Sequence, residues 1–248
     1  MTKFLFVTDL DHTFVGDDQA LLQLSDRLQQ HRQQYGTKIV YSTGRSPVLY
    51  RQLQQEKNLF SPDALVLSVG TEIYLDSRNI LDPEWSNILS QGWDRQKILA
   101  ITEQFPELVL QPHTEQRPFK VSFFLKGELS GILPRLKAEL QKSQLNVKLI
   151  YSSEIDLDIL PYTSDKGQAM RFLRLKWKFA VEQTVVCGDS GNDIALFAVG
   201  KERGIIVGNA RPELLQWYNQ NLADHRYLAQ NHYAAGILEG LQYFGFLK

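Results

Sequence analysis

The sequence lacks most of the features that would take it out of the ordinary globular class. Cys187 is its only cysteine among 248 residues, so no internal disulfide can form, which fits a reducing compartment. No apolar run approaches the roughly 20 residues of a membrane helix, and the run at residues 4–7 is too short for a signal peptide. Lysine and arginine (27) almost balance aspartate and glutamate (28), and a formal charge of -1 offers no basic surface for nucleic acid. We therefore expect a cytoplasmic protein that binds neither membranes nor nucleic acid.

Short apolar runs alternate with amphipathic helical patterns over most of the chain. Helical spacing places Leu21, Leu24 and Leu28 on one face. Apolar runs bounded by Gly, Asp, Ser or Thr are typical of buried parallel strands, and they occur at residues 4–7, 39–41, 64–67, 184–187 and 204–207. The alternation predicts an α/β fold, a Rossmann-like doubly wound parallel sheet, built from residues 1–80 and 162–248.

The middle of the chain, residues 81–161, has a different rhythm. The runs VSFFL, VKLIY and EIDLDIL alternate polar with apolar residues, as half-solvated antiparallel strands do. Helical patterns lie at residues 95–105 and 129–142. This segment is predicted to be a smaller α+β domain inserted into the larger one as a cap.

Polar clusters follow the predicted core strands at their C-terminal ends. They are the stretch DLDHT from Asp9, the stretch STGR from Ser42, Lys166 at a helix start, and GDSGND from Gly188. Ligands of open α/β sheets bind beyond these strand ends, so clusters far apart in sequence can meet there. Carboxylates are rarely buried without a partner, and hard cations take carboxylate oxygens. The set therefore predicts a Mg²⁺ site that also holds a phosphate.

These four motifs, in this order, resemble the haloacid dehalogenase superfamily of phosphohydrolases. The pattern is DxDx[TV], then a serine or threonine, then a lysine, then an acidic GD motif. Over nearly its whole length the chain is also similar to the bacterial single-module sucrose-phosphate phosphatases, through DLDHTFVGD, YSTGRS, SVGTEIY, SSEIDLDILP, CGDSGND and NARPELLQWY. The resemblance implies a catalytic core, residues 1–80 and 162–248, and a specificity cap, residues 81–161.

The paired aspartates of the first motif suit nucleophilic and acid–base roles. Asp9, ionised by contact with the metal, is the predicted nucleophile, since attack on phosphorus through an aspartyl phosphate divides hydrolysis into two easier steps. Asp11 is predicted to give a proton to the leaving alkoxide and later to take one from water. By resemblance, Mg²⁺ is held by Asp9, by the backbone carbonyl of Asp11 and by Asp189, with Asp193 contacting it directly or through a neighbour.

The transferring phosphoryl group needs fixed positive partners. Thr43, the Gly44 amide, Lys166 and Asn192 are the predicted phosphate contacts. Sugar selectivity is assigned to residues with hydrogen-bonding reach in the cap and near its hinges, namely Arg45, Glu72, Tyr74, Lys120 and Asp156. The resemblance implies sucrose 6-phosphate as substrate, sucrose and phosphate as products, and room for a transient contact with a sucrose-phosphate synthase.

Each of these predicted site residues, considered alone, also has a simpler structural explanation. An aspartate before a helix is often an N-cap, Thr43 and Gly44 could form an ordinary turn, and a lone lysine is usually solvated. Cys187 is better explained as core packing than as a nucleophile. Two other functions stay open: a phosphatase or mutase for another ligand, such as trehalose 6-phosphate, mannosyl-3-phosphoglycerate or a nucleotide monophosphate, and a non-catalytic phosphosugar-binding protein.

Overall fold

Two sheets organise the chain in the computed structural model, which describes residues 2–75, 80–126, 129–152 and 155–248. The parts of the predicted domains at residues 1, 76–79, 127–128 and 153–154 lie outside these ranges. The larger sheet has, in spatial order, β12 (Arg226–Leu228), β11 (Arg203–Ile206), β10 (Thr184–Gly188), β1 (Leu5–Thr8), β2 (Lys38–Ser42), β3 (Ala64–Leu67), β4 (Glu72–Leu75) and β5 (Ile80–Leu81). The smaller has β6 (Leu108–Leu110), β7 (Val121–Leu125), β9 (Asp156–Pro161) and β8 (Val147–Ser152).

The larger sheet is parallel from β12 to β3, and only its β3–β4–β5 edge runs antiparallel in the described chain. The five apolar runs singled out in the sequence form its centre, as β1, β2, β3, β10 and β11. Strands β4, β5 and β12 were not predicted. The last two contain two and three residues, too few for a periodic pattern to stand out.

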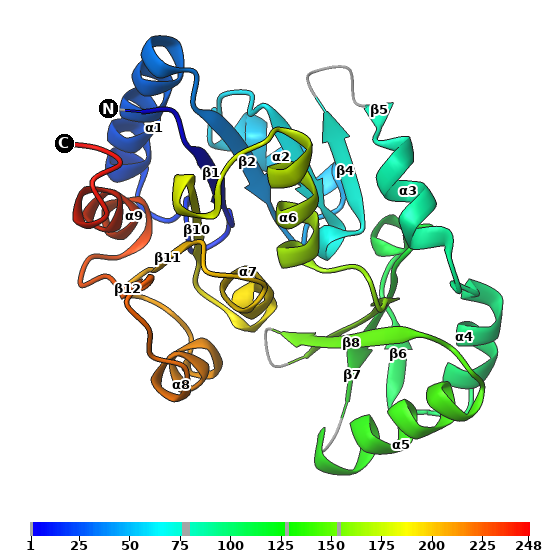
Figure 1. The fold of residues 1–248 in the computed structure, drawn as a ribbon. Coiled ribbons are helices and arrows are strands. Elements are labelled where there is room, and N and C mark those ends of the chain that lie inside the picture. Colours follow the sequence, from blue (N-terminus) through cyan, green and yellow to red (C-terminus); the bar gives the residue numbers. More distant parts are fainter. Residues whose placement is uncertain (1, 76–79, 127–128, 153–154) are drawn as a thin grey trace.

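Helices cover both faces of the larger sheet, as Figure 1 shows. One face carries α1 (Asp18–Tyr35), α2 (Pro47–Glu56) and α9 (Tyr233–Tyr243), and the other carries α3 (Pro83–Ser90), α6 (Lys166–Lys176), α7 (Ile194–Ala198) and α8 (Pro212–Gln220). Successive residues of β1 serve the two faces in turn, with Phe6 in the first cluster and Leu5 and Val7 in the second. The predicted doubly wound α/β core is confirmed.

The smaller sheet is antiparallel, and within the described residues helices pack against one of its faces. Helices α4 (Arg95–Thr102) and α5 (Leu129–Lys142), both expected from the sequence, pack on this face through a cluster that includes Val121, Phe123, Leu157 and Ile159. The strand residues between these point the opposite way, and they are largely polar. The face of the cap sheet opposite its helices is therefore largely polar.

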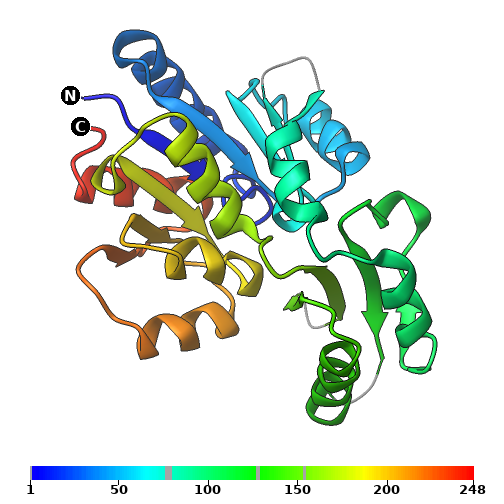
Figure 2. The same ribbon diagram turned by 45° about the vertical axis from the view of Figure 1, so that its right-hand side comes forward.

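Core and cap appear in Figures 1 and 2 as two bodies joined by the chain after α3 and the chain before α6. Helix α3 lies inside the predicted insertion, yet its Trp85 and Leu89 pack in the apolar cluster of the larger sheet. Strand β5 pairs with β4 of that sheet. The boundaries at residues 81 and 161 stay predictions.

Among the helices of the described ranges, none combines the length and the apolar character that crossing a bilayer demands.

Candidate active site

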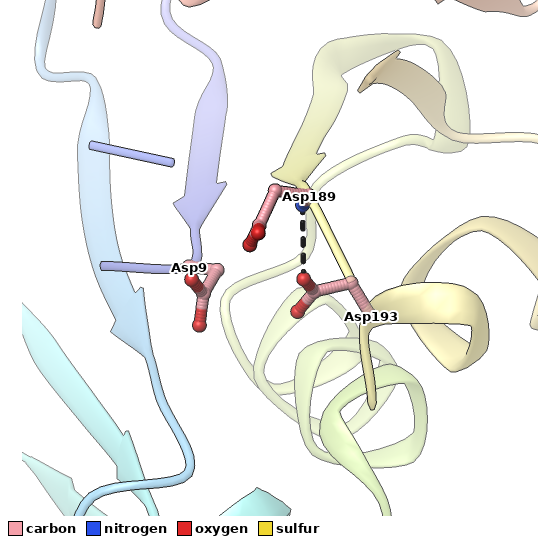
Figure 3. A group of neighbouring side chains, drawn as sticks. All are labelled: Asp9, Asp189 and Asp193. Carbon is pink, nitrogen blue, oxygen red and sulfur yellow. Dashed lines mark hydrogen bonds between the residues drawn. The ribbon is translucent and has the colours of Figure 1, made fainter. Parts of the chain in front are cut away.

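Three buried carboxylates meet where β1 and β10 end. Strands β1 and β10 are hydrogen-bonded neighbours, with Thr8 opposite Cys187, so Asp9 and Asp189 leave the sheet side by side. Asp193 closes the short turn that leads from Asp189 into α7. Figure 3 shows the three side chains pointing toward one another, and one oxygen from each lies within 4.8 Å of the others. The exposed fractions of the three residues are only 5%, 2% and 0%.

A lysine ammonium lies between two of these carboxylates. Lys166 is the first residue of α6, and its Nζ lies 2.6 Å from Asp9 Oδ1 and 2.6 Å from Asp193 Oδ1. The lysine side chain is fully buried. Asp165, the N-cap of α6, accepts a hydrogen bond from the Gln168 amide and fixes the start of the helix. The start of α6 therefore places the Lys166 ammonium at the edge of the sheet where β1 and β10 end.

Burial shapes the protonation of this cluster. Burial raises the pKa of Asp9 well above its usual range, although Lys166 opposes that shift. For Asp189, burial first and Asp193 second raise the pKa to about 7. Burial lowers the pKa of Lys166, but Asp193 and Asp9 outweigh it, so the ammonium stays charged.

The donor set fits a divalent cation. Three buried carboxylates share one buried ammonium, and the partly exposed Arg211 lies 4.0 Å from Asp189, so the negative charges outnumber the positive ones when all three carboxylates are ionised. Such charges are costly in a buried site without a counter-ion. Oxygen ligands at this spacing are what Mg²⁺ takes. Asp9 and Asp189 are the freer ligands, because both oxygens of Asp193 accept hydrogen bonds, from Lys166 and from the Asp189 and Ser190 amides. Within the described residues, the side-chain hydrogen bonds of Asp9 and Asp189 each use Oδ1.

The predicted phosphate contacts surround Asp9. Thr43, Gly44 and Asn192 line the same cavity as Asp9, and a Cβ on Gly44 would lie 3.8 Å from Asn192 Nδ2. Thr43 is 1% exposed and lies at the end of β2, the neighbour of β1 on the other side from β10. The structure therefore brings the second, third and fourth motifs together around the first.

The second aspartate of the first motif is held by an arginine. Arg45 donates from Nε to Asp11 Oδ2 at 2.7 Å and from Nη2 to Asp11 Oδ1 at 2.8 Å, a two-pronged pair. Its Nη1 also reaches the carbonyl of Leu49. Asp11 and Arg45 both line the cavity, so their pair forms part of its wall.

The cavity, of about 360 Å³, lies between the core motifs and the polar face of the cap sheet. Among the sugar contacts predicted in the sequence, Lys120 and Asp156 line it from the cap, and Arg45 lines it from the core. Gln111 donates to Asp156 Oδ1 at 2.8 Å, and Lys120 Nζ lies 3.4 Å from Asp158 Oδ1. The cap wall is thus built from hydrogen-bonded polar groups.

Glu72 and Tyr74 lie elsewhere. Neither lines the cavity. Glu72, 2% exposed, accepts from the Tyr74 hydroxyl at 2.7 Å and from Arg117 Nε at 2.5 Å. Burial, together with Glu72, raises the pKa of Tyr74. Both residues therefore belong to an ion-pair cluster beside the cavity rather than to its wall.

Residues 2–245 match the family described as Sucrose-6F-phosphate phosphohydrolase. The chain belongs to this family. It is 40% identical over 249 residues to "Sucrose-phosphatase 2" of Nicotiana tabacum, covering 96% of this chain and 58% of the relative. It is 33% identical to "Mannosylfructose-phosphate phosphatase" of Agrobacterium fabrum, covering 97% of this chain and 96% of that protein. The chain spans about three fifths of the length of the plant relatives.

Solved structures agree with the family. The sucrose-phosphatase of Synechocystis, determined in complex with sucrose and phosphate, is 40% identical with a TM-score of 0.92, over 99% of both chains. A haloacid dehalogenase-like hydrolase of Bacillus subtilis shares the fold at 20% identity and a TM-score of 0.69, over 98% of this chain and 92% of that one. The resemblance predicted from the motifs is confirmed.

Several cavity residues were missed in the sequence. Gln111, Glu115, Asp158 and Arg211 all line the cavity. Asp158 had a readable signal, because it lies two residues after Asp156 on the same face of a strand. Arg211 lies in the segment NARPELLQWY that carries the resemblance, but its proximity to the site, with Nε 4.0 Å from Asp189 Oδ2, is created by the fold.

Proposed function

We propose that this protein hydrolyses sucrose 6-phosphate to sucrose and inorganic phosphate, the last step of sucrose synthesis. The observation that supports it best is the arrangement around Asp9, a buried carboxylate that contacts Lys166 and faces a cavity lined by the polar side of the cap. The family and its sucrose-phosphatase relatives support the choice of substrate. A phosphoric monoester hydrolase needs a nucleophile, a proton donor and cationic phosphate contacts, and the chain supplies all three.

The reaction takes two displacements. An Asp9 oxygen forms a bond to phosphorus while the bond from phosphorus to the sugar oxygen breaks, and Asp11 gives its proton to that oxygen. Water then attacks the aspartyl phosphate, Asp11 takes the water's proton, and the bond between phosphorus and Asp9 breaks. Phosphate leaves, and both aspartates return to their starting protonation states.

Fixed hydrogen-bond donors, one of them the charged Lys166, are proposed to hold the phosphoryl group during both steps. Lys166, the Thr43 hydroxyl, the Gly44 amide and Asn192 are the proposed donors to its oxygens. Asp9, Asp189 and the Asp11 carbonyl, with Asp193 beside them, would hold Mg²⁺, which would supply positive charge to offset the negative charge of the phosphoryl group. The fit of three carboxylate oxygens within 4.8 Å supports this assignment.

Arg45 links the proton donor to the arriving substrate. Both oxygens of Asp11 are bound by Arg45, so Asp11 must leave this pair before it can donate a proton to the sugar oxygen. A sugar phosphate carries the anionic and hydroxyl groups that can compete for the guanidinium. We therefore place Arg45 among the substrate contacts.

The cap supplies the sugar contacts. Lys120 and Asp156, with Gln111 and Asp158 beside them, offer donors and acceptors at the far side of the cavity from Asp9. A site built from buried hydrogen-bonding groups rejects ligands that leave those groups unpaired. In this proposal the cap residues select the substrate, and the core residues around Asp9 carry out the chemistry.

A second substrate deserves a place in the test. The Agrobacterium relative named for mannosylfructose phosphate matches this chain over 96% of its own length, and both disaccharides contain fructose. The cap decides between them. Trehalose 6-phosphate, mannosyl-3-phosphoglycerate and a mutase reaction remain the other candidates predicted from the sequence.

The cellular setting is part of the proposal. Cys187, the single cysteine, is fully buried and burial raises the pKa of its thiol, so it is an inert packing residue suited to the reducing cytoplasm we propose. A transient contact with a sucrose-phosphate synthase stays a prediction.

The test is phosphate release in the presence of Mg²⁺. The wild-type protein should prefer sucrose 6-phosphate over mannosylfructose phosphate, trehalose 6-phosphate, fructose 6-phosphate, glucose 6-phosphate and p-nitrophenyl phosphate. Asp9→Asn should abolish both turnover and the phosphoenzyme. Asp156→Asn should raise KM for the sugar phosphate by about tenfold and leave the aryl phosphate unaffected, as loss of a charged hydrogen bond predicts. An active Asp9→Asn protein would contradict the mechanism, and preference for another ester would contradict the substrate.

A further inference from the structure

Residues 117–120, with the sequence RPFK, form a tight turn that leads into β7 of the cap. The turn closes on itself, because the Arg117 amide donates to the Lys120 carbonyl at 3.1 Å and the Lys120 amide donates to the Arg117 carbonyl at 3.2 Å. Its last residue is Lys120, which is 2% exposed and lines the cavity. The turn therefore decides where one cap contact stands.

The first residue of the turn is bound to the core sheet. Arg117 donates from Nε to Glu72 Oε1 at 2.5 Å and from Nη2 to Glu72 Oε2 at 3.2 Å. Glu72 belongs to β4, and its side chain is 3% exposed. The Tyr74 hydroxyl donates to the same carboxylate and completes its shell of donors. The hydrogen bonds to Glu72 raise the pKa of Arg117, so the guanidinium stays charged.

The two middle residues add further attachments. Phe119 packs against the apolar cluster of the larger sheet, which also includes Trp85 and Leu89 of α3. The Pro118 carbonyl accepts from Trp93 Nε1 at 2.8 Å, and Trp93 lies in the segment that joins α3 to α4. Arg117, Pro118 and Phe119 thus contact the core or the segment that connects it to the cap. Lys120 lies in the cap wall of the cavity.

We infer that Arg117 and Glu72 are positioning residues for substrate recognition, which tie the turn to the core so that the Lys120 ammonium keeps a fixed place relative to Asp9. This inference rests on the proposed function for the identity of the ligand, a sugar phosphate, but not for the geometry of the turn. Neither residue touches the cavity. They act through Lys120, whose Nζ lies 3.4 Å from Asp158 Oδ1.

A plainer role would be general stability, and the chain contains a matched pair for comparison. Arg174 of α6 lies 3.0 Å from Glu202, with side chains 13% and 2% exposed, against 26% and 3% for Arg117 and Glu72. Arg174 and Glu202 do not line the cavity. Removing either arginine leaves a buried glutamate without its partner, which is destabilising in both places.

The first experiment compares Arg117→Met with Arg174→Met. Arg117→Met should raise KM for the preferred sugar phosphate by about tenfold, the loss typical of one misplaced charged contact, with kcat/KM for p-nitrophenyl phosphate within about twofold of wild type. Arg174→Met should lower thermal stability without changing the ratio between the two substrates. Arg117→Lys, which keeps the charge but not the fork, should fall between. An equal loss on both substrates in Arg117→Met would overturn the inference.

The second experiment asks whether Arg117 acts through Lys120. In a double-mutant cycle, Arg117→Met combined with Lys120→Met should be no worse on the sugar phosphate than Lys120→Met alone, because the contact being positioned is already gone. Losses that multiply would show that Arg117 contributes by another route, and would overturn the inference.

A third readout does not depend on activity. Hydrogen exchange at the Arg117 and Lys120 amides should accelerate at least tenfold in Arg117→Met and stay unchanged in Arg174→Met. If the wild type hydrolyses no sugar phosphate but exchange at the turn responds in this way, the proposed function fails and the positioning of the turn stands. Unchanged exchange in Arg117→Met would overturn the positioning, whatever the substrate proves to be.

Discussion

At the scale of single residues, Lys166 provides the buried positive charge beside the carboxylates of the site. Lys166 touches both Asp9 and Asp193 at 2.6 Å and is fully buried, which is unusual for a lysine. Its place is fixed by two neighbours in sequence: Asp165 caps the helix, and Gly167 packs so closely on the Ala195 carbonyl that a Cβ there would lie 2.1 Å away. The short stretch DKG therefore serves the packing of α6 and places the lysine that we propose as a phosphate contact.

Lys166→Met tests this balance. We expect turnover to fall by about 10³-fold or more on every phosphate ester, because a fixed positive partner of the phosphoryl group is lost. The variant should also lose about 3–5 kcal/mol of stability at pH 8, since Asp9 and Asp193 would be buried without their cation. Thermal unfolding and phosphate release measure the two effects. Lys142→Met, at a side chain 79% exposed, is the control, and a loss confined to sugar phosphates would contradict the role of Lys166.

At the scale of elements, the site depends on how closely the turn after β3 meets the start of α6. Gly70 ends the 3₁₀ turn Ser68–Gly70 with φ +92°, and a Cβ there would lie 2.3 Å from the carbonyl carbon of Asp165 and 2.7 Å from the Lys166 nitrogen. The Gly70 carbonyl accepts from Trp85 Nε1 and from the Ser164 hydroxyl, at 3.1 Å each. The core sheet, α3 and α6 are thereby joined at one residue.

Gly70→Ala should separate these elements. We expect a loss of more than about 2 kcal/mol of stability and a lower kcat on all esters, because backbone atoms at the start of α6 must move and Lys166 moves with them. Gly36→Ala is the matched control: its φ is +78° with no atom within 4 Å, so it should cost only the left-handed strain of about 1–2 kcal/mol and leave kcat unchanged. Equal effects of the two changes on kcat would contradict the argument.

At the scale of the whole molecule, the buried carboxylates of the site lower the folding stability when they ionise, and in that charged form they can bind a cation. A carboxyl with a raised pKa holds its proton more tightly in the folded chain than in the unfolded one. For Asp189, the unfolding free energy should therefore fall as pH rises from 3.8 to about 7, by a few kcal/mol, and then level off. Asp9 shifts in the same direction, and Lys166 does not titrate in this range.

Magnesium should reverse this loss. We expect Mg²⁺ to raise Tm by about 5 °C or more at pH 8 and by much less at pH 5.5, where protons compete for the carboxylates. Thermal unfolding with EDTA or Mg²⁺ at the two pH values measures it. Asp189→Asn, which removes one of the two titrating carboxyls at similar size, should reduce both the pH dependence and the Mg²⁺ response, and the remaining pH dependence should come from Asp9. A Mg²⁺ effect of equal size at both pH values would count against a carboxylate site.

Local sequence patterns were enough to predict the core of the protein. Apolar runs of three or four residues located the central strands, and the polar residues that follow them located Asp9, Thr43 and Asp189, because the carboxyl ends of parallel strands share one edge of a sheet. The order of the motifs was enough to predict the family that the comparisons confirm. Local signals were sufficient here because each of these residues is placed by its own strand or helix.

Tertiary structure alone decided which polar side chains face one another. Glu72 and Asp156 both carry a carboxylate, yet Glu72 pairs with Arg117 while Asp156 lines the cavity. Arg45 reads as a sugar contact in the sequence, and the fold gives it Asp11 as a partner. These pairings join residues 34 to 45 positions apart across separate elements. No local pattern encodes such distances, because a side chain's partner depends on how sheets and turns pack, and only the folded chain fixes that.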